Sequence, residues 1–285
     1  MIRCSAATGP AGEPLAGTAP VTRRWLAVEH HGPWGREVTT DAGARLTALA
    51  RRANEAGARL TLIRPVHRRP DTGLRRVFLA ETAPGRTVVR GLWLPPERVA
   101  DVSFDAGDEV PEPVLLVCAH ARRDRCCAID GRALARGLAD QGADVWLCSH
   151  LGGHRFAPTA VVLPTGYVHG RLTVDLARRV LDATARGELE PAGQRGRSTW
   201  SRAGQVAELA VRERLVEHRA DALTVTDAEG GALVRHVDGR SWHVAVEHRT
   251  LPGSRPQSCG KPDEPITTLV ATAVEPVARL AATPA

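Results

Sequence analysis

The chain of 285 residues is 43% hydrophobic and 25% charged with a net charge of +6, values that are ordinary for a soluble globular protein. Lys261 is the only lysine, so the basic charge is nearly all arginine, scattered beside acidic residues and without a long basic block. This distribution argues against a nucleic-acid-binding protein, and the lack of any apolar run near about 18 residues argues against a membrane protein.

The N-terminal part of the chain is expected to alternate strands with one helix. A strand is predicted at 23–32 and a helix at 39–56, with Gly57 just past its end as a stop signal. Three more strands are predicted at 59–66, 75–82 and 86–94. The proline- and acid-rich passage 95–113 is interpreted as a linker.

The middle of the chain follows the order strand, helix, strand, hairpin and helix. These elements are predicted at 113–120, 131–141, 144–150, 159–171 and 173–187. Pro158 precedes the hairpin, and in thioredoxin-like folds a proline opens the third strand near the active loop. We therefore predict an α/β protein with a thioredoxin-like domain here. The N-terminal block has a similar order, which leads to the hypothesis of a degenerate second thioredoxin-like copy.

The C-terminal part is expected to form a small α+β unit. A Gly/Arg-rich joint is predicted at 193–197, followed by a helix at 203–218 and three strands within 220–249. The Pro-rich tail is expected to be extended. The predicted division is an N-terminal α/β domain at 1–110, the thioredoxin-like domain at 111–190 and the C-terminal unit at 191–285.

Cysteine and histidine residues gather in the middle block. Cys118 ends a predicted strand, the adjacent Cys126 and Cys127 precede a predicted helix, and His150 ends the next predicted strand. His154 follows in a loop with two glycines, which disfavour a helix. In a thioredoxin-like fold both strand ends open on the same sheet edge, so two Cys and two His ligands are expected to converge.

The cellular compartment affects how the cysteines are interpreted. The N-terminus has no apolar signal region, so we expect a cytoplasmic protein. Six cysteines in an intracellular chain of this size indicate metal binding or redox chemistry before structural disulfides.

Two stretches resemble the sucrase/ferredoxin-like family, VCAHARRDRCCAIDG and WLCSHLGGHRFAPTAVVLPTGYVHGRL. The likeness is strong over 113–187 and looser toward the N-terminus. Characterised members of the family are thioredoxin-like ferredoxins with a [2Fe–2S] cluster held by two Cys and two His. The resemblance implies an electron-transfer protein in which Cys126 is a neighbour of the cluster and not a ligand. The ligands that it implies are Cys118, Cys127, His150 and His154.

The chemistry of such a cluster suggests a role for the glycines between the histidines. Gly152 and Gly153 are predicted to form a hydrogen-bonding wall, because a backbone without side chains can approach the cluster sulfur atoms closely. A tight turn that needs positive φ is a compatible interpretation. Two neutral imidazoles in place of thiolates are expected to raise the reduction potential. Their remaining N–H groups are ionisable, so electron uptake can be coupled to a proton.

Other functions remain open at this point. The same two Cys and two His would suit a structural zinc ion. A thiol-disulfide or hydrolytic enzyme is a third class, but the chain contains neither a C-x-x-C pair nor a G-x-S-x-G motif, so an electron carrier is favoured over a hydrolase. A redox partner protein is expected, and not nucleic acid or a membrane. Basic residues near the cluster could dock an acidic partner or simply be solvated, namely Arg122, Arg123, Arg125 and Arg155.

Four further residues are weaker candidates. His120 could replace a ligand, but an ordinary loop histidine is the favoured interpretation. Cys148 is predicted to be a core residue, whereas Cys4 and Cys259 have no predicted place.

Overall fold

The middle block has the strand, helix, strand, hairpin and helix order that the sequence predicts. In this computed structural model the elements are β6 (Val114–Cys118), α4 (Arg132–Ala139), β7 (Val145–Cys148), β8 (Ala160–Leu163), β9 (Tyr167–His169) and α5 (Val174–Ala185). β6 is parallel to β7 and antiparallel to β8, and β8 is antiparallel to β9. The Ala157–Pro158 peptide before β8 is cis. The thioredoxin-like α/β arrangement is therefore confirmed.

The N-terminal block repeats these pairings. Its elements are α1 (Cys4–Thr8), β1 (Arg24–Glu29), α3 (Ala44–Glu55), β2 (Ala58–Pro65), β3 (Arg75–Glu81) and β4 (Val88–Leu94). β1 is parallel to β2 and antiparallel to β3, and β3 is antiparallel to β4. The structure describes residues 3–8, 12–38 and 43–277, so the predicted helix start at 39–42 lies outside the described residues.

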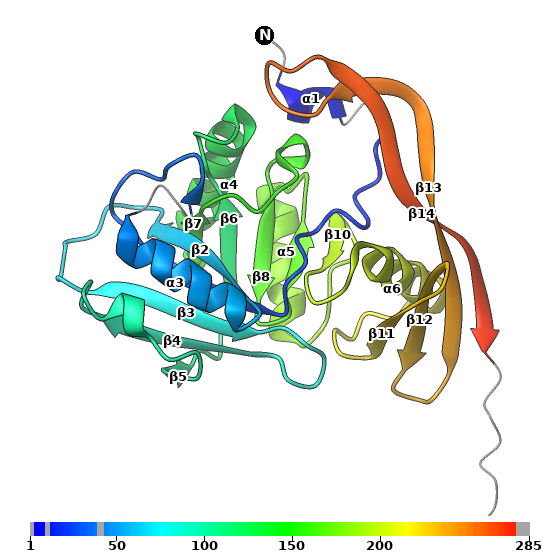
Figure 1. The fold of residues 1–285 in the computed structure, drawn as a ribbon, viewed down its shortest axis with the longest axis horizontal. Helices are drawn as coiled ribbons and strands as arrows, with labels where there is room; N and C mark the ends of the chain where they lie inside the picture. The colour runs from blue at the N-terminus through cyan, green and yellow to red at the C-terminus, as the bar shows by residue number, and fades with distance from the viewer. Residues whose placement is uncertain (1–2, 9–11, 39–42, 278–285) are drawn as a thin grey trace, which may run out of the picture.

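The two blocks form one continuous sheet because β2 pairs with β7 in antiparallel fashion, with Ile63 opposite Cys148 and Pro65 opposite Trp146. Two strands not named so far lie at its ends, β5 (Asp108–Glu109) and β10 (Gln194–Arg197). The order across the ten strands is β10-β9-β8-β6-β7-β2-β1-β3-β4-β5 (Figure 1). The shared sheet places the end of β6 and the end of β7 side by side at its centre. The predicted division of the chain into three domains, with boundaries after residues 110 and 190, stays a prediction.

Two segments differ from the sequence prediction. The predicted linker at 95–113 packs against the sheet: the helical turn η1 (Val99–Asp101) buries Val99, and Val102 is also buried. β5 within the same segment pairs with β4. The predicted joint at 193–197 is instead the strand β10, which pairs with β9 with a register shift between Gln194 and Gly196. The Gly/Arg-rich composition of this segment predicted a joint, but the two arginines of the strand are fully buried.

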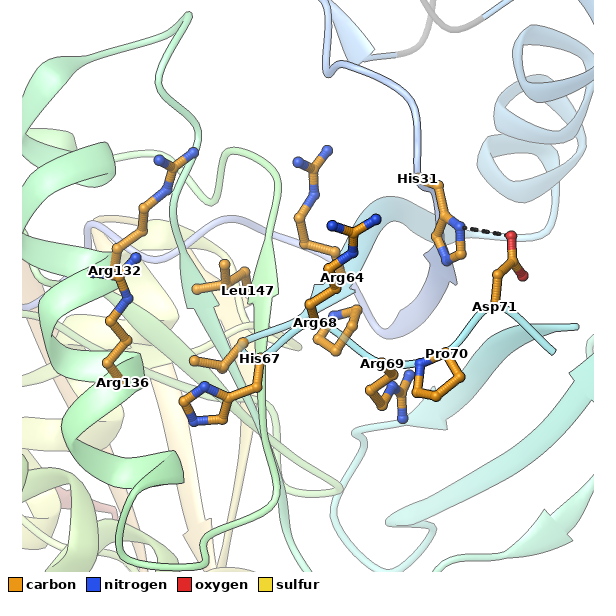
Figure 2. A pocket seen from close by; sticks show the side chains of 12 residues that line it. His31, Arg64, His67, Arg68, Arg69, Pro70, Asp71, Arg132, Arg136 and Leu147 are labelled. Atoms are coloured by element: carbon orange, nitrogen blue, oxygen red, sulfur yellow. Dashed lines mark ion pairs between the residues drawn. The ribbon is translucent and has the colours of Figure 1, made fainter. Parts of the chain in front are cut away.

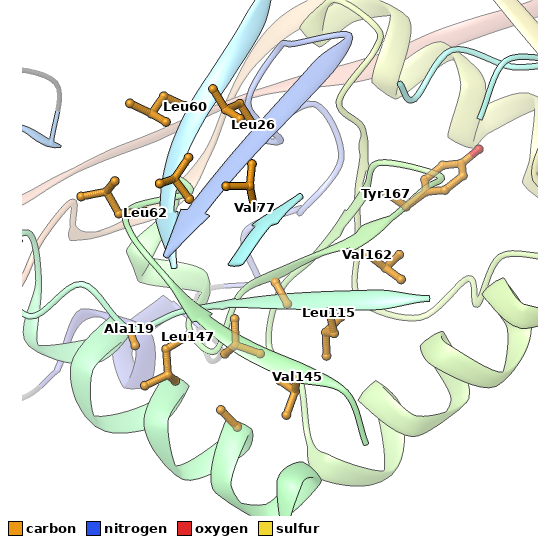
Figure 3. Packing of buried hydrophobic residues seen from close by; sticks show 14 of the residues in the cluster. Leu26, Leu60, Leu62, Val77, Leu115, Ala119, Val145, Leu147, Val162 and Tyr167 are labelled. Carbon is orange, nitrogen blue, oxygen red and sulfur yellow. The ribbon is translucent and has the colours of Figure 1, made fainter. Parts of the chain in front are cut away.

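Apolar side chains from both halves of the sheet meet in one core. Leu26 and Leu62 from one half and Leu115 and Val162 from the other belong to the same buried cluster (Figure 3). Helices α3, α4 and α5 contribute buried leucine, alanine and valine side chains to it. This packing fixes the ends of the central strands β6 and β7, where the cysteines lie. In the part of the chain that the structure describes, no helix has the length and apolar character needed to cross a membrane.

The C-terminal unit contains one helix and a four-stranded sheet in sequence order. Its elements are α6 (Arg202–Leu215), β11 (Leu223–Ala228), β12 (Gly231–His236), β13 (Ser241–Pro256) and β14 (Asp263–Val277). The tail is extended as expected, but β13 and β14 pair as one long hairpin with register shifts that include the Leu251–Ser254 region. The fourth strand was missed because prolines normally disfavour a strand. The hairpin turn reaches back to α1 at the N-terminus (Figure 1).

Candidate metal centre

Three of the predicted ligands meet where the central parallel strands end. Cys118 is the last residue of β6 and pairs with Cys148 at the end of β7, so the loops after both strands leave the sheet at one edge. Cys127 begins a π-helical turn, Cys127–Gly131, that leads into α4. His150 follows β7 by two residues. The sulfur atoms of Cys118 and Cys127 and a ring nitrogen of His150 all lie within 4.8 Å of one another.

His154 is close to this group but does not belong to it. Its ring lies beside that of His150, with 5.5 Å between the centroids and 30° between the planes. Its Nε2 lies 2.6 Å from the carbonyl oxygen of Gln257, and because a carbonyl only accepts, this nitrogen carries the proton. Nδ1 of His154 and Nδ1 of His150 are buried and have no hydrogen-bond partner among the described residues. Second-sphere bonds of this kind fix the tautomer of metal-binding imidazoles.

The pKa values of the two cysteines in the group are shifted in opposite directions. A hydrogen bond from Cys127, together with one from His150, lowers the pKa of Cys118 well below its usual value although burial opposes the shift. The same bond to Cys118 and burial raise the pKa of Cys127 well above its usual value. The two shifts favour the thiolate form at Cys118 and the thiol form at Cys127. Thiolate is the form of cysteine that binds metals.

Arg195 supplies a buried positive charge beside these thiols, and the sequence did not reveal it. The side chain is 0% exposed and donates to neutral oxygens, which are the carbonyl of Gly152 at 3.1 Å and the hydroxyl and carbonyl of Thr18. Burial lowers the pKa of Arg195 to about 9, and the negative charges of Cys118 and Cys127 act to raise it. The thiol pair of Cys118 and Cys127 is thus the source of negative charge that can compensate this cation. Its only sequence signal is an arginine in a Gly/Arg-rich segment.

The glycines between the histidines are required by the backbone of the loop. Gly152 has φ +83° and Gly153 has φ +65°, both in the left-handed region that favours glycine. A side chain at Gly153 would also collide with the guanidinium of Arg195. Apart from its chain neighbours, no heavy atom of the described residues lies within 4 Å of the Cβ position at Gly152. Their predicted role as hydrogen-bond donors to a cluster stays a prediction.

Cys126 and His120 lie outside the group. Cys126 packs with Cys4 and Cys259 in a separate buried cluster. His120 is buried, its Nε2 lies 2.8 Å from the carbonyl oxygen of Gly35, and its ring meets that of His150 edge-on at 6.4 Å. Burial lowers the pKa of His120, which favours its neutral form, and its ring is a packing neighbour of His150.

A basic hollow gives access to His150 from the surface. It has a volume of 670 Å³, and its lining includes His120, His150, Arg36, Arg51, Arg59 and Arg123. Of the four arginines proposed from the sequence for partner docking, Arg123 lines this hollow and pairs with Glu37. Arg122 and Arg125 are exposed, whereas Arg155 is paired with the buried Glu13.

A second basic hollow of 660 Å³ lies between α4 and the loop after β2 (Figure 2). Arg132 and Arg136 line it from α4, and Arg64, Arg68 and Arg69 line it from the other side. Part of this charge is already balanced, since Arg69 pairs with Glu29. Cys118, Cys127 and His150 do not line this second hollow.

The fold and the site together define a thioredoxin-like α/β protein with a candidate Cys/His metal centre. The model of the sucrase/ferredoxin-like family matches residues 15–196, more than half of the chain, and the chain therefore belongs to the sucrase/ferredoxin-like family. The match runs through the large sheet to β10 and includes Cys118, Cys127 and His150. No curated protein and no solved structure matches the chain.

Proposed function

We propose that this protein transfers electrons and that Cys118, Cys127, His150 and His154 hold one [2Fe–2S] cluster. The observation that carries the proposal is the convergence of two thiols and an imidazole within 4.8 Å at the end of the central strands. The Nδ1 atoms of His150 and His154 are buried, have no hydrogen-bond partner in the described part of the chain, and fit the same donor set. When bound, such a cluster accepts and returns a single electron.

The protein's own residues would set the charge around that cluster. The lowered pKa of Cys118 favours its thiolate form, and a backbone hydrogen bond from Leu151 contributes to this shift. Arg195 provides a fixed positive charge that favours an anionic group in the site. The hydrogen bond from His154 Nε2 to Gln257 orients the ring and leaves Nδ1 as the free donor atom. An N–H that remains on a bound imidazole can also lose or gain a proton, which would couple electron transfer to pH.

We expect the electron to enter or leave through the basic hollow above His150. His150 is half-buried and lines this hollow, whereas Cys118 and Cys127 are fully buried. The arginines around the hollow would attract an acidic surface and orient it over the imidazole edge. A redox partner with an acidic docking face is therefore the partner that fits.

Zinc bound by the same residues is the second candidate. The observation that favours it is the short spacing of the three donor atoms, all within 4.8 Å, which a single ion can span. A zinc ion would be redox-silent and would give a colourless protein. The two candidates are therefore separated by spectroscopy on the reduced protein.

Pulsed electron paramagnetic resonance of protein carrying ¹⁵N-histidine tests the cluster and its histidine ligands together. We expect the reduced protein to show nitrogen couplings from imidazole, weakened in His150→Cys and in His154→Cys. His120→Asn is the matched control, since His120 is buried beside His150 but outside the group. A missing paramagnetic signal, or couplings unchanged in both histidine variants, would refute the assignment.

A further inference from the structure

A second group of potential ligands lies next to the first and joins three distant parts of the chain. Its members are Cys4 at the start of α1, Asp124 and Cys126 before the π-helical turn, and Cys259 in the turn between β13 and β14. One donor atom from each lies within 4.8 Å of the others. Cys4 and Cys126 are 0% exposed, and Asp124 is 4% exposed. The family match covers residues 15–196, so Cys4 and Cys259 lie outside it.

The sulfur spacing fits one metal ion. The Sγ atoms are 3.4 Å apart between Cys4 and Cys126, 3.2 Å between Cys126 and Cys259, and 3.8 Å between Cys259 and Cys4. A disulfide would need a separation of about 2.05 Å. Three thiolates at about 2.3 Å from a tetrahedral zinc ion stand about 3.8 Å apart. The three sulfurs therefore form a slightly contracted face of such a tetrahedron.

The carboxylate of Asp124 lies beside the triangle of sulfur atoms, where it can provide a fourth ligand. Its Oδ1 is 3.8 Å and its Oδ2 3.9 Å from the sulfur of Cys4. Oδ1 accepts the backbone N–H of Cys126 at 2.9 Å, while Oδ2 accepts the N–H of Cys259 at 2.9 Å and the hydroxyl of Ser258 at 2.7 Å. The carboxylate thus already bridges the segments that carry two of the cysteines. These bonds fix its position beside the sulfurs.

Backbone donors point at the sulfurs as they do around bound thiolates. The N–H of Ser5 lies 3.4 Å from the sulfur of Cys126, and the N–H of Cys4 lies 3.5 Å from the sulfur of Cys259. Hydrogen bonds from an outer shell orient metal ligands and stabilise their charge. Three sulfurs converging in a largely buried place, with Cys259 half-buried, would repel one another as thiolates unless a cation is bound between them.

We infer that Cys4, Cys126 and Cys259 bind one zinc ion, with Asp124 as the fourth ligand. Thiolates select soft or borderline metals, and a carboxylate completes a tetrahedral zinc site. Four protein ligands leave no open position, so the site is structural. It fastens α1 and the hairpin turn to the loop in front of α4.

This zinc site borders the cluster site through two residues. Cys126 precedes Cys127 directly, and Gln257, whose carbonyl accepts from His154, lies two residues before Cys259. His154 Nε2 is also 3.8 Å from Oδ2 of Asp124. Loss of zinc would free the hairpin turn and therefore the carbonyl that orients His154. We expect zinc to hold the His154 ring in place.

Metal analysis of the full-length protein tests the inference independently of iron. Wild type expressed with zinc is compared with Cys4→Ser, Cys259→Ser and Cys259→His, and zinc per chain is measured together with cobalt titration of chelator-treated protein. Cys148→Ser is the matched control, because Cys148 is fully buried but belongs to neither ligand group. The histidine variant keeps a ligand, so it shows whether loss of zinc in the serine variant reflects misfolding.

We expect one zinc ion per chain in wild type and Cys148→Ser, and none in Cys4→Ser and Cys259→Ser. Cys259→His should retain the metal with a shifted cobalt spectrum. Zinc that persists in both serine variants would overturn the inference. So would metal-free wild type with a disulfide among these cysteines, or additional iron and sulfide that depend on Cys4. Failure of the cluster proposal would appear separately, as absent iron in a protein whose zinc still depends on Cys4 and Cys259.

Discussion

At the scale of single residues, Arg195 is a buried cation whose pKa is influenced by the charges of Cys118 and Cys127. It is fully buried on β10, and the hydrogen bonds that it donates go to neutral oxygens of Thr18 and Gly152. A buried cation of this kind is costly unless an anion lies nearby. The nearby anion is the Cys118 and Cys127 pair. Arg197, on the same strand and also fully buried, pairs with Asp221 instead.

We predict that Arg195→Met lowers the midpoint potential of the reconstituted protein. Reduction adds negative charge, and loss of the neighbouring cation makes that addition less favourable. A lost interaction of about 1.4 kcal/mol corresponds to a fall of about 59 mV for a one-electron couple. Redox titration of the variant beside wild type measures the shift.

Arg197→Met is the matched control for this titration, since its own countercharge is Asp221. Its potential should stay near that of wild type even if its stability falls. Equal shifts in both variants would show that Arg195 acts through general packing and not through its charge.

At the scale of secondary structure, the entry into α4 depends on a close approach between helix and strand. A Cβ atom at Gly131 would overlap the carbonyl oxygen of Cys118 at the end of β6. Gly131 ends the π-helical turn that Cys127 begins. The glycine therefore allows the turn to bring Cys127 against Cys118. π-helical turns of this kind are frequent at functional sites.

We predict that Gly131→Ala destabilises the protein by about 1–3 kcal/mol, because the added methyl group must push the turn away from β6. The displacement should also reduce the iron retained after reconstitution. Denaturant unfolding and iron analysis measure the two effects.

Gly137→Ala tests the same substitution further along the same helix. Among the described residues outside its own helix, the added Cβ would meet only the end of the Val174 side chain. Alanine also favours a helix over glycine by about 1 kcal/mol. The control variant should keep its iron. A Gly131→Ala variant with wild-type stability and full iron would contradict the role of the close approach.

The predicted strands are stabilised by local apolar sequence, whereas the strands that were missed depend on partners distant in sequence. The strands ending at Cys118 and Cys148 are continuous apolar runs, which predict buried strands from local sequence alone. β10 could not be predicted, because Arg195 and Arg197 are buried through partners distant in sequence. The same holds for β14, whose prolines argue against a strand until its hairpin partner is known.

The residues of the candidate site likewise include some that local sequence predicts and others that only the tertiary fold reveals. Cys118, Cys127 and His150 are signalled by residue type at strand and helix ends. The position of His154 depends on Gln257 in the C-terminal hairpin, and no local pattern reports that contact. Cys4 and Cys259 are isolated in sequence and meet Cys126 only through the tertiary fold. A ligand group whose residues come from separate segments cannot be predicted from local sequence patterns, because only the tertiary fold brings the residues together.

At the scale of the whole molecule, Glu13 connects three segments near the two sites. Its carboxylate accepts from Arg155 in the turn after His154 at 2.9 Å, and from Arg255 in β13 at 2.6 Å. Glu13 and Arg255 are each 1% exposed. The N-terminal segment, the histidine loop and the C-terminal hairpin thus share one buried ion-pair network.

The stability contributed by this network should depend on pH. Burial alone would raise the pKa of Glu13, but the hydrogen bonds from Arg255 and Arg155 lower it below its model-peptide value of 4.5. A carboxylate with a lowered pKa stabilises the fold above the unfolded value and loses this contribution as pH falls through the folded value. The stabilisation should therefore be complete near neutral pH and decline below pH 4.5.

We predict that Glu13→Gln lowers the free energy of unfolding by about 3–5 kcal/mol at neutral pH, because it leaves buried arginine charge unpaired. The difference from wild type should shrink as pH falls below 4.5. Denaturant unfolding at several pH values measures it, with the exposed Glu229→Gln as control. A difference that is constant down to low pH would exclude ionisation of Glu13 as its source.

The central claim is that the Cys118 site holds an iron–sulfur cluster, and its most direct test is elemental analysis of anaerobically purified protein beside its Cys126→Ser and Cys127→Ser variants. We predict a red-brown wild-type protein with about two irons and about two acid-labile sulfides per chain. Cys127→Ser should lose both or change the absorption spectrum strongly. Cys126→Ser should keep the iron and the sulfide, because Cys126 is not a cluster ligand, and should change the spectrum only slightly through movement of the His154 ring. A colourless wild-type protein that takes up no iron or sulfide on anaerobic reconstitution and holds zinc that depends on Cys127 would contradict the claim.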